Sequence, residues 1–313
     1  MSNPGFSADW LRLREPHDQA ARQAAFKALD GHDLVVRWRA AASPRGGDAT
    51  FEVTDLACGS GANLRELAPR LGGRQRWRLV DHDPALLAAL PLALSEWAGR
   101  EGHHLTQTAD GLLHIDGAGF SAEVRSWQLD LARDLSRLDL AHTHLLTASA
   151  LLDLVSLPWL RELLGQARAA GVPMLFALNV DGRHLWDPED ADDRLVHGLF
   201  SRHQQRDKGF GPALGPQAPA EVVRLLSEAG FGVRQAQSDW LIQGQGGHAM
   251  QTALIQGVAA AALEQSPSDG GAVLAWTTRR LARINTTSLR VGHVDIAATL
   301  DQPAAGLKSR SHS

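Results

Sequence analysis

Apolar and polar positions follow two different periods along the chain, and the two kinds of segment alternate. Short runs that read as buried strands are residues 51–57, 77–84, 143–149 and 172–180. Helical spacing covers the segments between them, at 61–72, 84–99 and 151–171. Regular alternation of this kind predicts a mostly parallel sheet covered on both faces, with ligands at the carboxyl ends of its strands.

The remaining segments add a hairpin, an arm and two insertions. IDGAGF (115–120) predicts a hairpin turn between two alternating strands, and residues 8–30 predict a helical arm broken at Pro16. Residues 181–219 are polar and rich in Gly and Pro, which is typical of a lid or binding loop. The later pattern predicts helices at 219–230, 248–265 and 271–284, a strand at 231–242 and a last strand at 289–300.

These patterns predict one main domain with additions. Residues 1–45 form the N-terminal helical arm and 46–300 the ligand-binding domain. Within that domain, 184–215 is a lid-like insertion and 248–284 a helical insertion before the last strand, and 301–313 is a flexible tail.

Composition narrows the classes of partner. A hydrophobic fraction of 44% supports a large core, whereas a net charge of -4 does not favour nucleic acid or an anionic membrane. No stretch approaches the roughly 18 apolar residues of a membrane span. One cysteine gives no disulfide framework, and we therefore expect a cytoplasmic protein, a monomer or homodimer, with a small-molecule partner. The Ala, Arg and Leu bias is typical of a GC-rich bacterial genome.

The segment VTDLACGSGANL (53–64) follows the first predicted strand and opens a helix, as a dinucleotide-binding loop would. However, Leu64 stands where such a loop has its third glycine, and the charge of Asp55 would repel a pyrophosphate. A phosphate loop would also end in Lys with Ser or Thr. The loop therefore favours a ligand that approaches backbone closely, lacks phosphate and carries positive charge.

A second acid supports a nucleoside-containing ligand. Asp81 ends the next predicted strand, about 20 residues beyond the glycines, where a carboxylate accepts hydrogen bonds from ribose hydroxyls. Its neighbour Asp83 precedes Pro84 and is better explained as a helix cap. S-adenosylmethionine, with an ammonium, a sulfonium and no phosphate, fits both acids.

On these residues the chain resembles the class I S-adenosylmethionine-dependent methyltransferases, in an uncharacterised bacterial subgroup. Asp55, Ala57, Gly59 and Gly61 occupy the places of the family's first motif, with Ala57 where Gly is commonest. The resemblance implies a Rossmann-like, doubly wound sheet of about seven strands whose last strand is reversed. It also implies S-adenosylmethionine as cofactor and S-adenosylhomocysteine as product. The implied cofactor-binding residues are Arg14, Asp55, Ala57, Gly59, Ser60, Gly61, Asp81, His82, Asp130, Leu131 and Thr147.

The roles within that set differ. Asp130 and Leu131 match residues that face adenine, and Thr147 lies in the segment that matches the fourth strand. Arg14 lies in the arm, from which it could pair with the methionine carboxylate.

Methyl transfer requires alignment first and proton removal second. Asp153 and His203 are the leading catalytic candidates by placement. Other acids near strand exits, and aromatic residues that could wall the acceptor pocket, are Asp181, Asp207, Asp239, Trp186, Phe210 and Trp240. His293, in the last strand, could also serve as a base, although a structural role is favoured.

The chemistry of particular residues disfavours several alternative functions. Cys58 is expected to pack rather than to attack, which disfavours cytosine-C5 methylation, and an NPPY-type motif is missing. The histidine pairs at 103–104 and at 142 and 144 lack a carboxylate cluster, so no metal site is predicted. The favoured function is N- or O-methylation of a small molecule. A non-catalytic protein that binds S-adenosylmethionine or S-adenosylhomocysteine is the alternative, and an NAD(P)-linked oxidoreductase is third.

Overall fold

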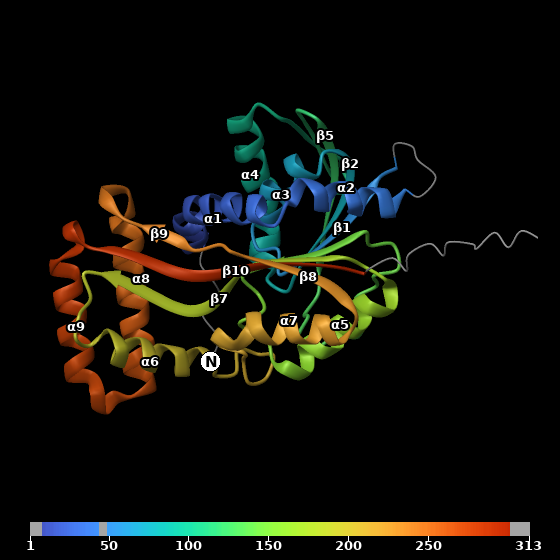
Figure 1. The fold of residues 1–313 in the computed structure, drawn as a ribbon. Coiled ribbons are helices and arrows are strands. Elements are labelled where there is room, and N and C mark those ends of the chain that lie inside the picture. Colours follow the sequence, from blue (N-terminus) through green and yellow to red (C-terminus); the bar gives the residue numbers. More distant parts are fainter. Residues whose placement is uncertain (1–7, 44–48, 301–313) are drawn as a thin grey trace, which may run out of the picture.

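The computed structural model describes residues 8–43 and 49–300. Their strands form one sheet with the order β3-β4-β5-β2-β1-β6-β7-β10-β8, and β9 pairs with β10 (Figure 1). The strands are β1 (Phe51–Leu56), β2 (Gly73–Asp81), β3 (His104–Gln107), β4 (Leu113–Gly117), β5 (Phe120–Gln128), β6 (Leu145–Ser149), β7 (Met174–Asp187), β8 (Phe231–Gln237), β9 (Trp240–Ile242) and β10 (Ser288–Leu300).

The seven central strands confirm the predicted doubly wound topology. β5, β2, β1, β6 and β7 are parallel neighbours. β10 runs antiparallel between β7 and β8, which makes the last strand of the chain the reversed one. The predicted hairpin is also present, since Gly117 pairs with Phe120 across the turn between β4 and β5. The strand β3, which extends this edge, was not predicted.

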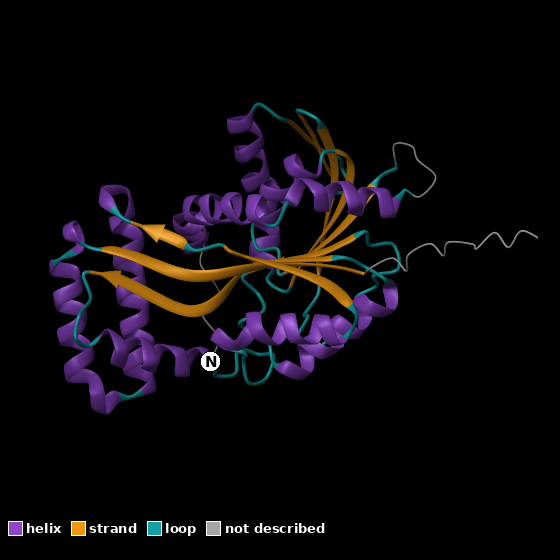
Figure 2. Cartoon of the chain, in the orientation of Figure 1, coloured by secondary structure: helices purple, strands orange, loops and turns teal. Residues whose placement is uncertain are grey.

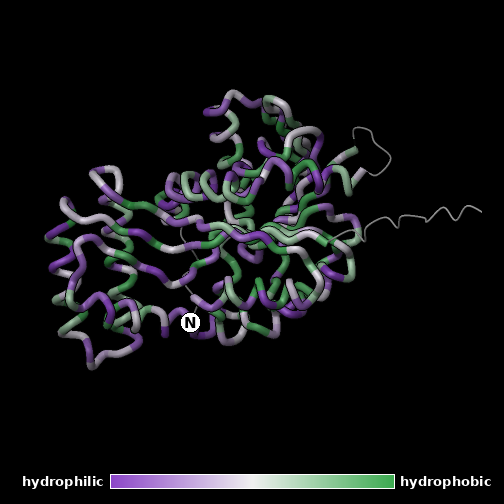
Figure 3. Tube along the Cα trace, viewed as in Figure 1, coloured by the Kyte–Doolittle hydropathy of each residue, from purple (hydrophilic) through white to green (hydrophobic). Residues whose placement is uncertain are grey.

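Helices cover both faces of the sheet (Figure 2). On one face lie α1 (Ala8–Ala28), α2 (Gly31–Ala42), α3 (Ala62–Leu71) and α4 (Pro84–Glu101), and on the other α5 (Leu157–Ala170) and α7 (Ala218–Glu228). Each face encloses an apolar core, one around Trp77 and Leu64 and one around Phe176 and Leu163. The apolar stretches run through the middle of the molecule in Figure 3.

A third core lies under an extension of the sheet. The long antiparallel pair β7 and β10 continues beyond the parallel strands and packs on α6 (Asp193–Gln204), α8 (Gly244–Gln265) and α9 (Gly270–Ala282). Trp186, Trp276 and Met250 are buried there. The two predicted late helices are thus confirmed as α8 and α9.

Three elements differ from the sequence prediction. The arm is not broken at Pro16, because contacts of Glu15 and Asp18 on either side hold α1 against the rest of the protein. Residues 181–219 are not one long loop, since β7 reaches Asp187 and α6 follows. The segment 231–242 is two strands, because the carboxylate of Asp239 in the connection accepts hydrogen bonds from Arg183.

Two further facts bear on the expected setting. No helix among the described residues is long and apolar enough to cross a membrane. The predicted flexible tail, 301–313, lies outside the described residues.

Candidate functional site

The loop after β1 has a backbone that few side chains tolerate. Ala57, Gly59 and Gly61 have φ values of 51°, 54° and 80°, in the left-handed region. A Cβ on Gly61 would lie 2.9 Å from Leu90 Cδ2, so glycine is required there by packing as well as by φ. Ala57 adopts the same conformation with a side chain, at a position where the resembled family most often has glycine. Within this loop the amides of Gly59 and Gly61 are used by the fold, since they donate to Asp81 Oδ2 and to the carbonyl of Cys58.

Asp55 is the buried acid of the site. It is 0% exposed, and its Oδ1 accepts a hydrogen bond of 2.7 Å from Asn63 Nδ2. Its Oδ2 has no partner among the described residues. Burial is the main cause that raises the pKa of this carboxyl to about 7, and the hydrogen bond from Asn63 opposes the rise. A buried carboxylate with a free oxygen favours a ligand that brings a cation or a donor.

Asn63 was missed as a site residue, and it joins Asp55 to the neighbouring strand. The same Nδ2 donates to Thr147 Oγ1 at 3.0 Å, and Thr147 donates to the carbonyl of Leu175 at 2.7 Å. Thr147 is therefore a support behind Asp55 rather than an exposed contact. The signal in the sequence was a polar residue in the first turn of a helix that otherwise packs against the sheet.

Asp81, at the end of β2, fixes the loop from the other side. Its Oδ2 accepts the Gly59 amide at 2.8 Å and its Oδ1 accepts the Asp83 amide at 3.0 Å. Asp83 itself caps α4 by accepting from the Ala85 amide, which confirms the cap interpretation. His82 is 76% exposed, with Nδ1 3.3 Å from Asp81. Each Asp81 oxygen retains a lone pair with which to accept a hydroxyl.

The arm crosses this loop and is bonded to it. Glu15 accepts hydrogen bonds of 2.9 and 2.7 Å from Arg65, and Arg65 donates to the carbonyl of Ser60 at 2.7 Å. A Cβ on Gly59 would lie 3.7 Å from Leu11 of the arm. The Glu15–Arg65 ion pair, with little exposure, thus ties α1 to the loop and to α3.

Arg14 points to a different part of the site. Its guanidinium bonds Asp18 at 2.8 and 3.2 Å and lies over the Trp240 ring, 5.1 Å from its centre. Trp240 Nε1 donates to Asp18 at 2.9 Å. Arg14 is therefore held by an acid of its own helix, and its pairing with a ligand carboxylate stays a prediction.

Asp153 follows β6 and is the second buried acid. It is 8% exposed, and its Oδ1 has no partner among the described residues. Burial raises its pKa to about 6, while its own backbone amide and the charge of Arg14 oppose the rise. Ala150, just after β6, and Leu178, within the neighbouring β7, have φ of 54° without being glycine. Strained residues of this kind often mark functional sites, so these positions are candidates for the acceptor side.

His203 is placed elsewhere. It lies on α6 with Nε2 3.2 Å from Glu264 of α8, and Arg206 pairs with the same carboxylate. No contact among the described residues joins His203 to Asp153. The structure thus gives His203 a role in holding α6 on α8.

Most of the other candidates are engaged in the fold. Asp181 and Asp239 both pair with Arg183, and Asp207 accepts the amides of Gly209 and Gly211. Of the expected pocket walls, Phe210 packs on Trp159 and Trp186 lies in the core under β7. Trp240 alone of these three lies beside Arg14.

The third strand end matches the resemblance in part. Asp130 is partly exposed just beyond β5, where it accepts the Ala132 amide at 3.0 Å. Leu131, by contrast, buries its side chain in the core, and its carbonyl accepts Trp159 Nε1 at 2.6 Å. Of these two residues, Asp130 is therefore the one that presents its side chain toward solvent.

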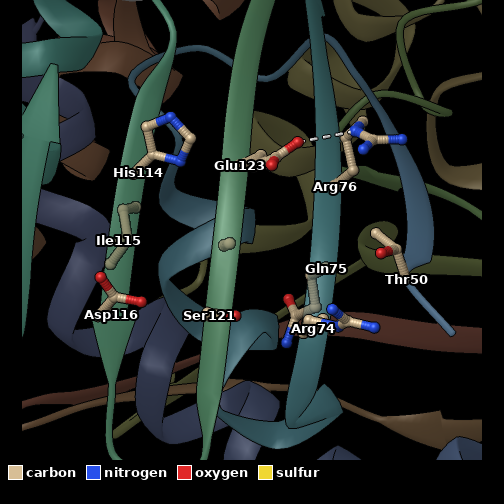
Figure 4. Close-up of a pocket in the computed structure, with 10 residues that line it drawn as sticks. Thr50, Arg74, Gln75, Arg76, His114, Ile115, Asp116, Ser121 and Glu123 are labelled. Carbon is tan, nitrogen blue, oxygen red and sulfur yellow. Dashed lines mark hydrogen bonds and ion pairs between the residues drawn. The ribbon is translucent and has the colours of Figure 1, made fainter. Parts of the chain in front are cut away.

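A cavity of about 360 Å³ lies on another part of the sheet (Figure 4). Its lining includes Arg76, Glu123, His114 and Asp116, and Arg76 pairs with Glu123 at 2.9 Å. These residues belong to the amino-terminal halves of β2 and β5 and to β4. Because ligands of doubly wound sheets bind beyond the carboxyl ends, this cavity is separate from the candidate site.

No family model and no curated protein matches the chain. Among solved structures, it is similar to a cyclopropane-fatty-acyl-phospholipid synthase-like protein from Lactobacillus casei, with 13% identity, 94% of each chain covered and a TM-score of 0.49. It is also similar to precorrin-6y C5,15-methyltransferase from Geobacter metallireducens, with 10% identity, 84% of this chain and 86% of that chain covered, and a TM-score of 0.39.

A third similar structure contains the product of the cofactor. This is a Haemonchus contortus phosphoethanolamine N-methyltransferase solved with S-adenosylhomocysteine, with 10% identity, 96% of this chain and 59% of that chain covered, and a TM-score of 0.40. At such identities and TM-scores, the likeness says nothing about activity in this chain.

Proposed function

We propose that the chain is an S-adenosylmethionine-dependent methyltransferase that transfers the methyl group to nitrogen or oxygen of a small molecule. The observation that carries the proposal is Asp55, a fully buried acid with an unpartnered oxygen directly before a glycine loop. A pyrophosphate would be repelled there, whereas the charge of an ammonium would be attracted, directly or through water.

The residues around the loop fit the rest of such a cofactor. Asp81 is positioned to accept ribose hydroxyls, and the left-handed φ values of Gly59 and Gly61 form the tight loop beside it. Asp130 lies at the next strand end, where adenine is expected. Arg14 is the candidate to pair with the carboxylate of the cofactor. That carboxylate would have to share the Arg14 guanidinium with Asp18, which already bonds it. When bound, the cofactor supplies a methyl group that is electrophilic because it is attached to a sulfonium.

The protein's own contribution is mainly placement and exclusion of water. The arm closes over the loop through Glu15 and Arg65. The predicted insertions 184–215 and 248–284 include α6 and α8, which pack together beyond the strand ends. Alignment of two reactants can supply about 7 to 11 kcal/mol of the barrier, more than a single base contributes. Asp153, buried directly after β6, is the candidate that acts on an acceptor through its charge.

The proposal can be tested without knowing the acceptor. Calorimetry with S-adenosylhomocysteine and, separately, NADH should show binding of the first and not of the second. Incubation with methyl-labelled S-adenosylmethionine and the small-molecule fraction of a bacterial extract should then give labelled product and S-adenosylhomocysteine. Binding of NADH alone would refute the proposal, and binding of S-adenosylhomocysteine without turnover would favour a non-catalytic binding protein.

A further inference from the structure

His293 is a buried histidine on β10, opposite the middle of β7. It is 2% exposed, and it pairs with Val180 in the β10 to β7 ladder, beside an irregularity at Gly292. Its backbone amide donates to Asp239 Oδ1 at 3.1 Å. Because Asp239 is also paired with Arg183, the backbone that carries this imidazole is fixed from two strands.

The imidazole is held in one tautomer. Nδ1 lies 3.1 Å from the carbonyl of Val291, which can only accept, so Nδ1 carries the proton. No hydrogen bond within the described part of the chain uses Nε2, and this nitrogen is not among the fully enclosed polar atoms without partners. Nε2 is therefore a lone-pair acceptor that is not fully enclosed by the described residues.

Its surroundings connect it to the acceptor side of the site. The Trp240 ring lies 4.6 Å from the imidazole, and the same indole lies under Arg14. The charge of Arg14 acts on both His293 and Asp153. The arm therefore places one guanidinium near the buried acid after β6 and the imidazole on β10.

The environment keeps this imidazole neutral. Burial, followed by the charge of Arg14, lowers the pKa of His293 to about 3. The charge of His184, when protonated, would lower the pKa further, while the Val291 carbonyl and Asp239 oppose the effect. A histidine in this state always offers its lone pair near neutral pH, but it is a weak base.

We propose that His293 Nε2 accepts the proton of a hydroxyl group on the methyl acceptor, so that the transfer is an O-methylation. This inference rests on the proposed methyltransferase function and narrows its substrate class to alcohols or phenols. The hydroxyl oxygen forms the new bond to the methyl carbon as the carbon–sulfur bond breaks and its electron pair stays on sulfur. The O–H bond breaks, its proton passes to Nε2, and the imidazolium later loses that proton to water.

A weak base suits a hydroxyl better than an amine. As the oxygen is methylated it becomes a protonated ether, which is a strong acid, so even a weakly basic imidazole takes its proton. An amine must already be neutral before it attacks, and its methylated product keeps its proton at neutral pH. A base that cannot deprotonate an ammonium would therefore be of no use to an amine acceptor.

The test compares His293→Gln with His114→Gln. Glutamine cannot take up the proton, whereas His114 is a strand histidine beside the separate cavity. Calorimetry with S-adenosylhomocysteine is done first on the wild type and both variants, because absence of binding by the wild type refutes the proposed function itself. Once binding is established, we measure methylation of the hydroxyl-containing compounds of a bacterial extract. Turnover should fall about 10²- to 10⁴-fold in His293→Gln and should not fall in His114→Gln. S-adenosylhomocysteine affinity should change by less than about twofold, as expected for a residue outside the cofactor contacts.

Two further measurements separate catalysis from a structural role. His293→Ala should regain part of its turnover when free imidazole is added. Nitrogen-15 NMR of the wild-type protein at pH 7 should show His293 protonated on Nδ1 and not on Nε2. Four outcomes would each overturn the inference. Two concern turnover: unchanged turnover in His293→Gln, or cofactor-product binding by the wild type without turnover. The other two are labelled products that are all N-methylated, and a His293 ring that is protonated on both nitrogens.

Discussion

Replacing Asp55 by Asn keeps the size of the side chain and removes its charge. In the wild type the ionised carboxylate would attract the ammonium of the cofactor, directly or through a bridging water. A hydrogen bond to a charged partner contributes about 1.5 to 3 kcal/mol. We therefore expect Asp55→Asn to weaken S-adenosylhomocysteine binding at pH 8 by about 10- to 150-fold.

The same substitution should affect stability with a defined sign. The folded pKa of Asp55, about 7, exceeds its ordinary value of 3.8. The folded protein therefore holds an extra proton between about pH 4 and 7, and stability falls as pH rises through that range. The full difference corresponds to about 4 kcal/mol as an upper bound. Asp55→Asn, which has no charge to bury, should become progressively more stable than the wild type across the same range.

Both effects can be measured on purified protein. Calorimetry with S-adenosylhomocysteine at pH 6, 7 and 8 gives the affinity, and thermal melts from pH 4 to 8 give the stability. In the wild type, affinity should fall as Asp55 becomes protonated below about pH 7, and this dependence should be weaker in the variant. Asp116→Asn, at an acid beside the separate cavity, is the matched control.

The binding measurement and the stability measurement can each contradict the reasoning independently. Equal affinity and equal pH dependence in a folded Asp55→Asn protein would remove Asp55 from the cofactor site. A melting-temperature difference that does not grow between pH 4 and 8 would instead show that burial does not raise this pKa.

Three other substitutions test the loop and the arm. Asp81→Ala should weaken S-adenosylhomocysteine binding by about 1 to 3 kcal/mol through lost ribose hydrogen bonds, and unchanged affinity in calorimetry would exclude that contact. Ala57→Gly should raise the free energy of unfolding by up to about 1 kcal/mol in urea titration, because glycine has no penalty at a φ of 51°; a fall would contradict the strain argument. Glu15→Gln removes the ion pair with Arg65, so S-adenosylhomocysteine should bind and leave faster in stopped-flow fluorescence, and unchanged rates would mean that the arm does not gate entry.

The pattern of the chain was sufficient to predict the central sheet. Strands such as 51–57 are apolar runs between helices of clear periodicity, and their order follows from the alternation and the family resemblance. The reversed last strand follows from the same resemblance. The positions of Gly59 and Gly61 also agree with prediction, because a tight strand-to-helix turn constrains φ locally.

The parts that were missed depend on distant partners. The sequence of the β7 extension resembles a polar loop. Its histidines and acids find their hydrogen-bond and stacking partners on other, distant elements. Asp181 pairs with Arg183, which also bonds Asp239, and His184 stacks on His197 at 4.6 Å. Asn63 looks like the end of a loop until β1 and β6 pair and bring Thr147 beside Asp55. No local pattern reveals such pairs, because each is created when elements distant in the sequence pack together.

The β7 and β10 extension has a consequence for how such a protein can diversify. Its core around Trp276 and Met250 is distinct from the two cores that flank the parallel strands. Substitutions that repack α6, α8 and α9 can therefore reshape the acceptor end while the loop after β1 keeps its geometry. Selection for new acceptors should fix changes in this separate layer first, and hydrogen exchange should show it opening as its own cooperative unit.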